Sequence, residues 1–175
     1  MPVHEAVTAV FPGMFDPVTY GHLDIIRRGR RLFDRLIVAV GHNPAKTELF
    51  TQAERVEMLS EVLGELPRVE MASYKGLTVE FVRRIGAQVI LRGIRDTVDL
   101  RAELQAANTN LIVGEVETVF LMTSDQHALT SSTLIKQCVA MGQTEFPNLN
   151  RFVPDAVLAK LRERLARRED ADEAD

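Results

Sequence analysis

The sequence predicts one α/β domain, in which a doubly wound parallel sheet carries helices on both faces. Short runs of β-branched residues alternate with segments of helical length, which is typical of βα units around a parallel sheet. No internal repeat, Gly/Ser linker or change of composition divides the body of the chain. The predicted strands are residues 6–11, 35–40, 68–72, 88–93 and 117–122.

Local signals mark the starts of two helices. Thr51 and Glu54 form a capping-box pattern, followed by apolar residues at helical spacing. Pro154 lies in the first turn of a last amphipathic helix, where its missing N–H is tolerated. Ligands are therefore expected at the carboxyl ends of the strands that these helices connect.

Charge divides the chain into a domain, residues 1–168, and an acidic tail, residues 169–175. The tail holds five carboxylates, and without it 21 basic residues face 20 acidic ones. We expect a disordered, solvating tail. A balanced body without a broad basic stripe disfavours nucleic-acid binding.

Several classes of protein are disfavoured by what the sequence lacks. The single cysteine, Cys138, lies in an apolar helical run and is expected in the core, in a reducing compartment. No apolar run reaches the roughly 20 residues of a membrane span, and residues 1–6 do not resemble a secretory signal, so a soluble, cytoplasmic protein is expected. Neither a Walker loop nor a GxGxxG fingerprint follows the first strand, which disfavours a kinase or a dehydrogenase. Histidines and carboxylates show no metal-ligand spacing.

The first strand leads into a segment suited to holding phosphate. Gly13 and Gly21 permit close approach of the backbone, and His22 falls where a new helix exposes unpaired N–H groups. A lone histidine there is more often a capping or surface residue. Asp16, before Pro17, is interpreted as a structural turn residue.

Other candidate residues also have a plain alternative. Lys46 follows the second strand and could be merely solvated, as could Arg92 and Arg95. Arg92, however, ends an apolar strand at the carboxyl edge of the sheet, where its charge needs a partner that a bound phosphate would supply. Ser131 and Ser132 precede a helical run and could be N-caps, a role compatible with phosphate binding.

These segments together resemble one enzyme family. The run PGMFDPVTYGH (12–22) is similar to the PG(T/S)FDPxTxGH signature of the bacterial phosphopantetheine adenylyltransferases, in the TxGH/HxGH nucleotidyltransferase superfamily. The resemblance spans residues 7 to about 165 and implies a Rossmann-like nucleotidyltransferase fold. Its further matches are a lysine segment at 43–46, RGIR at 92–95, Glu103 and Asn110 at the family's spacing, and TSST at 130–133.

The resemblance implies a reaction in coenzyme A biosynthesis. A phosphate oxygen of 4′-phosphopantetheine would attack the α-phosphorus of ATP, giving dephospho-coenzyme A and pyrophosphate. Mg²⁺ would arrive with the ATP phosphates, no nucleic acid or membrane would take part, and the assembly would be a homohexamer.

It also implies roles for individual residues. The catalytic residues would be His22, Lys46 and Arg95. ATP would be bound by Met14, Phe15, His22, Gly93, Ile94, Arg95, Glu103, His127, Ala128, Leu129, Thr130, Ser131, Ser132 and Thr133. The acceptor would be bound by Met14, Lys46, Thr78, Arg92 and Asn110.

Two departures from the family pattern keep alternatives open. Met14 stands where the family has Thr or Ser, and His127 where many members have an aromatic residue. Methionine cannot donate a hydrogen bond to phosphate. The alternatives are a nucleotidyltransferase for nicotinate or nicotinamide mononucleotide or glycerol phosphate, and a non-catalytic nucleotide-binding sensor.

Overall fold

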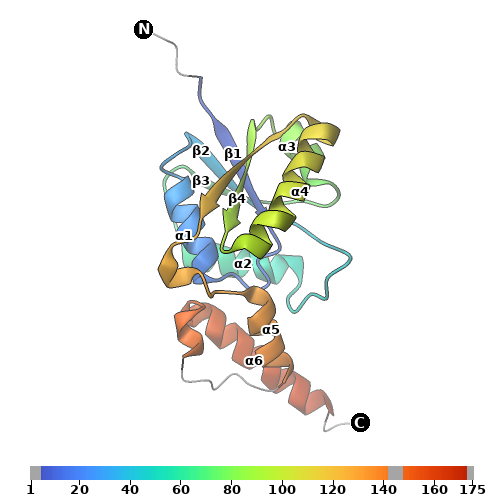
Figure 1. Cartoon of the computed structure of the whole chain (residues 1–175). Coiled ribbons are helices and arrows are strands. Elements are labelled where there is room, and N and C mark those ends of the chain that lie inside the picture. The colour runs from blue at the N-terminus through green and yellow to red at the C-terminus, as the bar shows by residue number, and fades with distance from the viewer. Residues whose placement is uncertain (1–4, 142–147, 173–175) are drawn as a thin grey trace.

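A five-stranded parallel sheet forms the centre of the molecule (Figure 1). The computed structural model describes residues 5–141 and 148–172. All five predicted strands are present, and the α/β fold is confirmed. The strands, in the spatial order β3-β2-β1-β4-β5, are β1 (Thr8–Gly13), β2 (Arg35–Val40), β3 (Val69–Ser73), β4 (Val89–Ile94) and β5 (Glu117–Met122).

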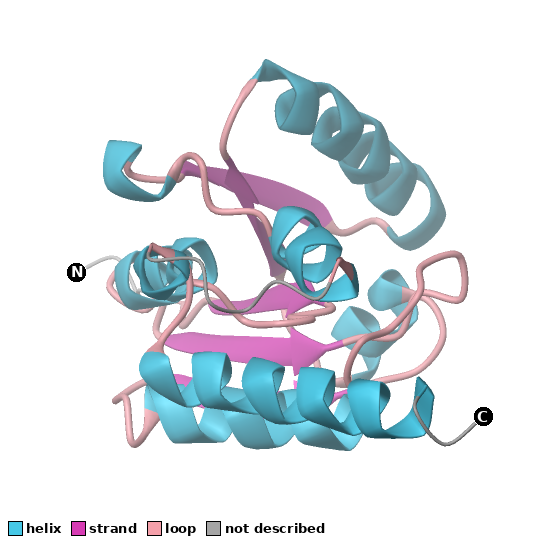
Figure 2. Ribbon diagram, turned by 90° about the horizontal axis from the view of Figure 1, so that it is seen from below, coloured by secondary structure: helices cyan, strands magenta, loops and turns pink. Residues whose placement is uncertain are grey.

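Helices cover both faces of this sheet (Figure 2). The predicted capping box is formed: Thr51 Oγ1 accepts from Glu54 N, and the Glu54 carboxylate accepts from Thr51 N. The last helix begins directly after Pro154. The helices are α1 (Tyr20–Gly29), α2 (Gln52–Leu63), α3 (Thr78–Arg84), α4 (Thr97–Gly114), α5 (Ser132–Ala140) and α6 (Asp155–Asp172), with short 3₁₀ turns η1 (Asp125–His127) and η2 (Leu149–Arg151).

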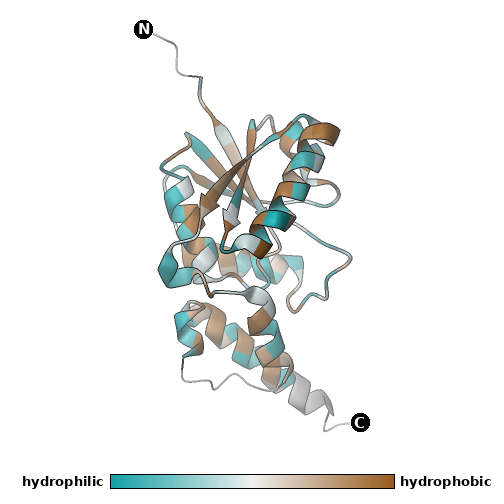
Figure 3. Ribbon diagram, viewed as in Figure 1, coloured by the Kyte–Doolittle hydropathy of each residue, from teal (hydrophilic) through white to brown (hydrophobic). Residues whose placement is uncertain are grey.

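The core is divided between the two faces of the sheet. The strands that separate its two parts are brown along much of their ribbons in Figure 3. Alternate residues of β1 point to opposite sides, so Phe11 packs with α1, α2, α5 and α6 while Val10 packs with α3. The larger cluster includes Ile26 and Leu59, and the smaller includes Phe81. These two apolar clusters, one on each face, fix the position of the strands and of their carboxyl ends.

The order of the strands reverses at β1, and this opens a crevice. Strand β1 pairs with β2 along its whole length, as far as Gly13 with Val40. It pairs with β4 only at Ala9–Val89 and Val10–Ile90. The carboxyl ends of β1 and β4 therefore separate, and such a switch point is where ligands bind in open α/β sheets.

The last helix extends into the segment expected to be an acidic tail, and the disorder expected there stays a prediction. Helix α6 continues through Asp172, so the backbone of residues 169–172 is helical, while residues 173–175 lie outside the described residues. No Gly or Pro follows Pro154 to stop this helix. Within the described ranges, the model contains no helix with the length and apolar character needed to cross a bilayer.

Candidate active site

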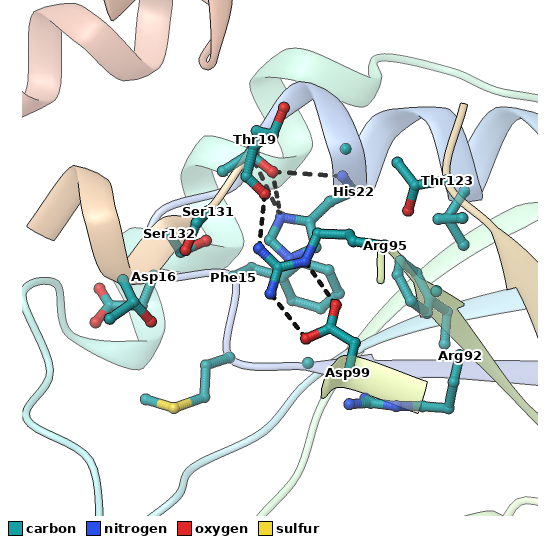
Figure 4. Close-up of a pocket in the computed structure, with 18 of the residues that line it drawn as sticks. Phe15, Asp16, Thr19, His22, Arg92, Arg95, Asp99, Thr123, Ser131 and Ser132 are labelled. Atoms are coloured by element: carbon teal, nitrogen blue, oxygen red, sulfur yellow. Dashed lines mark hydrogen bonds and ion pairs between the residues drawn. The ribbon is translucent and has the colours of Figure 1, made fainter. Parts of the chain in front are cut away.

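A cavity of about 290 Å³ lies at the carboxyl ends of β1 and β4 (Figure 4). Its walls come from the β1–α1 loop (residues 14–19), the first turn of α1, the end of β4, α4 and the start of α5. Motifs far apart in the sequence therefore meet at one place. The predicted site residues that line it are Met14, Phe15, His22, Lys46, Arg92, Gly93, Arg95, Glu103, Thr130, Ser131, Ser132 and Thr133.

The capping of α1 fixes the tautomer of His22. Thr19 is the N-cap, and its side chain accepts from the His22 amide. In return, the amide of Thr19 donates to His22 Nδ1 over 3.1 Å. A backbone N–H can only donate, so Nδ1 is unprotonated and the proton of the neutral ring is on Nε2.

The surroundings of His22 keep this ring neutral. Burial, followed by the positive charges of Arg92 and Arg95, lowers its pKa from the usual value near 6.5 to about 4. At neutral pH the ring is therefore uncharged, with Nε2–H as its hydrogen-bond donor. A neutral donor is suited to a group on which negative charge develops.

Aromatic packing fixes the orientation of this ring. The Phe15 ring meets the His22 ring edge-on, with centroids 5.0 Å apart, and Phe11 packs against Phe15 at 5.5 Å. Phe15 is buried and has a positive φ of 50°, an uncommon conformation for a bulky residue. A Cβ at position 13 would lie 2.9 Å from the Phe15 ring, so glycine is needed there.

Two arginines, one in β4 and one directly after it, line the cavity, and each is held by a carboxylate of α4. Arg92 donates to both oxygens of Glu103, at 2.7 and 2.5 Å, and to the Pro12 carbonyl in the gap between β1 and β4. Arg95 donates to both oxygens of Asp99, at 2.6 and 2.9 Å. Bidentate pairs of this kind fix the guanidinium planes at the edge of the sheet.

Asp99 was not predicted as a site residue. Hydrogen bonds from Arg95 hold the pKa of its carboxyl below the usual range. Its position four residues after Arg95 on a helix is a signal that the sequence contains. Gly93, between the two arginines, packs on α1: a Cβ there would lie 2.9 Å from Ile25.

The start of α5 forms another wall. Ser131 is the N-cap and accepts from the Leu134 amide, while Ser132 Oγ donates to the Pro17 carbonyl at 2.9 Å. Arg95 donates to the Thr130 carbonyl at 3.0 Å, which joins this wall to β4. Capping and lining of the cavity are thus combined in the same residues.

Lys46 reaches the cavity from the β2–α2 loop (residues 41–51) and is exposed. The far end of this loop is tied to the β1–α1 loop, because Asp16 accepts from the amides of Leu49 and Phe50, each at 2.9 Å. Asp16 is almost fully buried, in agreement with its predicted structural role. Lys136, a cavity residue that sequence reasoning missed, donates to Asp16 at 3.2 Å and to the Thr47 carbonyl at 2.9 Å.

Some predicted residues lie outside the cavity wall. His127 stacks on Tyr20 with centroids 5.9 Å apart, and Thr78 shares a hydrogen bond with Tyr74. The Ile94 side chain is buried. Roles for these residues remain predictions, as they do for Ala128, Leu129 and Asn110.

Comparisons with known proteins agree with this geometry. Residues 10–138 match the family model described as cytidylyltransferase-like. The chain is 47% identical over 159 residues to a phosphopantetheine adenylyltransferase of Gloeobacter violaceus, covering 90% of this chain and 96% of the relative. A phosphopantetheine adenylyltransferase of Leuconostoc citreum is 43% identical over 157 residues, covering 90% and 98%.

A solved structure shows a similar fold. The lipopolysaccharide core biosynthesis protein of Thermoplasma volcanium superposes with a TM-score of 0.50 at 21% identity, covering 69% of this chain and 98% of that one. At this identity the likeness concerns the fold alone. The sequence relatives, in contrast, match nearly the full length of the chain.

Proposed function

The chain belongs to the phosphopantetheine adenylyltransferases, and on this premise we propose that it transfers the adenylyl group of ATP to 4′-phosphopantetheine in coenzyme A biosynthesis. The products are dephospho-coenzyme A and pyrophosphate. The observation that carries the proposal is a neutral His22, with its Nε2 proton fixed, beside two arginines at the switch point of the sheet. We place the reaction in the cytoplasm.

The proposed reaction needs positioning and charge stabilisation rather than an enzyme base. A phosphate oxygen of the acceptor attacks the α-phosphorus, a new P–O bond forms, and the bond to the β-phosphate oxygen breaks as pyrophosphate leaves. The attacking phosphate is already an anion, so no proton has to be removed from it. His22 Nε2–H would donate to the α-phosphate as charge is redistributed in the transition state.

Three cationic side chains would bind and orient the substrates. Lys46 would orient the attacking phosphate, Arg92 would bind the acceptor phosphate, and Arg95 would contact ATP. This division is supported by their places on the cavity wall, with Lys46 on a loop and both arginines at the sheet edge. The carboxylates that pair with the arginines keep their planes fixed before a ligand arrives.

Magnesium is proposed as part of the substrate, bound to the ATP phosphates. Among residues 5–141 and 148–172, no group of three or more His, Cys, Asp or Glu side chains could hold a metal ion. The cavity carboxylates are already engaged: Asp16 by two amides and Lys136, Asp99 and Glu103 by arginines. The described carboxylates of the cavity are therefore not free to bind a resident metal ion.

A homo-oligomer, a hexamer in the family pattern, is also proposed. Helix α4 exposes apolar side chains, among them Val98 at 77% and Ile112 at 81% exposure. The apolar residues of this helix are the brown stretches of its ribbon in Figure 3. Val113 on the same helix and Met122 on β5 are also more than half exposed. A patch of this kind is typical of a surface that another chain covers. Sedimentation equilibrium at several concentrations tests the assembly, and a monomer at all of them would contradict it.

An acceptor panel tests the reaction. We expect pyrophosphate release from Mg–ATP with 4′-phosphopantetheine and little with nicotinate mononucleotide, nicotinamide mononucleotide or glycerol phosphate. CTP in place of ATP is the control for the nucleotide. Equal turnover with a mononucleotide acceptor would overturn the acceptor, and ATP binding without turnover would favour the sensor.

A further inference from the structure

The position of Lys46 depends on contacts made by its neighbours in the β2–α2 loop. Lys46 itself is exposed, and locally its amide bonds only to the Asn43 carbonyl, at 3.0 Å, in a turn that the Asn43 side chain closes on Ala45. Such a turn shapes the loop but does not fix it to the rest of the fold. The nearest contacts that do so are made by the next two residues: the Thr47 carbonyl accepts from Lys136 at 2.9 Å, and the Glu48 carboxylate accepts from Arg55 at 2.7 Å.

Glu48 is bound by an arginine of α2 that is completely buried. The side chain of Arg55 has no exposed surface, and its Nη2 donates to Glu48 Oε1 at 2.7 Å. Its Nη1 donates to the Gly41 carbonyl at 3.0 Å and to the Met14 carbonyl at 2.8 Å. One guanidinium therefore joins the end of β2, the middle of the β2–α2 loop and the β1–α1 loop.

The chemistry of this contact is specific to arginine. A guanidinium has five donors in a rigid fork, so it can serve two carbonyls and a carboxylate in one plane. Lysine has a single charged centre on a flexible stem and cannot reproduce that arrangement. Burying the charge is tolerated because the Glu48 carboxylate and the carbonyls of Met14, Gly41 and Thr51 all accept hydrogen bonds from it.

We propose that Arg55, acting through Glu48, is a positioning residue that holds Lys46 at the acceptor phosphate. The inference rests on the proposed function, in which Lys46 orients the attacking phosphate. Arg55 donates a hydrogen bond to Glu48, which is two residues from Lys46. It also donates to the carbonyl of Met14 in the cavity wall. It thus sets the distance between the two sides of the acceptor subsite.

Glu48 also receives a contact from the surface. His42 Nδ1 lies 2.8 Å from the same oxygen, Oε1, that Arg55 binds. The hydrogen bond from His42, followed by the charge of Arg55, holds the pKa of the Glu48 carboxyl below its usual range. The carboxylate is therefore ionised at neutral pH and remains a partner for Arg55.

A double-mutant cycle separates positioning from general stabilisation. Glu48→Ala is made in the wild type and in Lys46→Met, and acceptor and ATP kinetics are measured for all four proteins. Glu70→Ala is the matched control, because Glu70 also pairs with an arginine, Arg35, through two hydrogen bonds, but at the opposite ends of the strands. Arg55→Lys tests whether the forked geometry of the guanidinium is required, because it keeps the positive charge. This variant is assayed well below its melting temperature.

If Arg55 positions Lys46, Glu48→Ala raises the acceptor KM about tenfold, changes the ATP KM by less than about twofold, and has almost no effect once Lys46 is Met. Arg55→Lys should behave in the same way, and Glu70→Ala should retain wild-type kinetics. Equal losses in both backgrounds, or equal losses for ATP and acceptor, would overturn the inference.

Binding measurements keep this test independent of the reaction. Calorimetric titration of 4′-phosphopantetheine into the same four proteins gives the coupling between Glu48 and Lys46 without turnover. Failure of the wild type to release pyrophosphate would overturn the proposed reaction. Absence of coupling in the calorimetric cycle would overturn the role of Arg55 alone.

Discussion

The two sides of the cavity are built differently. On one side, His22 is held at Nδ1 by Thr19, packed against Phe15 and kept neutral by burial and two arginines. On the other side, Lys46 is exposed on the β2–α2 loop. This loop is attached to the rest of the fold through contacts of residues near Lys46, such as Glu48 and Leu49. The His22 side is fixed before any ligand binds, whereas the Lys46 side depends on a few anchors.

This difference corresponds to the two tasks of the proposed reaction. Stabilising charge on the α-phosphate requires a donor whose orientation does not change during the reaction. Binding the acceptor phosphate requires a cation that can contact this phosphate at the solvent-exposed mouth of the cavity and then hold it in one position. We therefore expect substitutions at His22 to act mainly on kcat and substitutions in the β2–α2 loop to act mainly on the acceptor.

The largest effect is expected at His22. Replacing His22 with Ala removes a preorganised donor and should lower kcat by about two to three orders of magnitude, with a much smaller change in ATP affinity. Steady-state kinetics and ATP titration measure the two quantities. A change confined to KM would instead make His22 a ground-state binding residue and remove the contrast with Lys46.

A smaller effect is expected at Lys46. Lys46→Met keeps the length of the side chain but removes its charge, and should lower kcat/KM for the acceptor about ten- to a hundredfold, the usual range for a hydrogen bond to a charged group. The ATP KM should change little. Kinetics with each substrate varied in turn provide the check, and a larger loss toward ATP than toward the acceptor would contradict the assignment.

Met14 lies where the two sides meet, since its carbonyl is bound by Arg55 and it lines the cavity. A hydroxyl here could donate to the acceptor phosphate, so Met14→Thr should raise acceptor kcat/KM by about tenfold and leave ATP affinity almost constant. Met14→Val is the control for bulk without a donor. If neither variant differs from the wild type by more than about twofold, position 14 has no acceptor-binding role.

The last expected effect is on stability rather than on activity and concerns the neutral His22. Its pKa is about 4 when folded and near 6.5 when unfolded, so between these values the unfolded chain binds a proton that the folded chain does not. This contribution is constant above pH 6.5 and decreases as pH falls toward 4, by at most about 1.4 kcal/mol per pH unit.

Urea denaturation between pH 7 and pH 4.5 measures this slope, and His22→Asn is the reference. Asparagine cannot titrate but can still accept from the Thr19 amide. The difference in slope between the two proteins isolates His22 from the carboxylates that also titrate in acid. Identical slopes would mean that the ring is charged in the folded protein near pH 6.

Much of the fold and of the site could be predicted from local patterns. The β-branched runs predicted all five strands. In the inner strands β2, β1 and β4, burial between two layers of helices requires continuous apolar residues, whereas the edge strands β3 and β5 are only partly buried. The chemistry of His22, Lys46, Arg92 and Arg95 could also be predicted, since Arg92 lies near the carboxyl end of a strand and the other three follow a strand, at the edge where ligands bind. Asp99 could have been found at helical spacing from Arg95.

The partners of these residues were decided by the tertiary structure. Arg55 binds a carbonyl 41 residues away, and Lys136 binds Asp16 across 120 residues, through a strand order that no local pattern encodes. Arg55 lies on the buried face of α2 beside Met58 and Leu59. The sequence pattern could therefore have indicated a buried charge at this position, but it could not have identified the groups that accept its hydrogen bonds. The sequence by itself determined which chemical groups are available to the site and on which helices, strands and loops they lie, because residue type and periodicity are local properties. The protonated nitrogen of His22 and the anchors of Lys46 depend on burial and long-range contacts, which only the folded chain brings together.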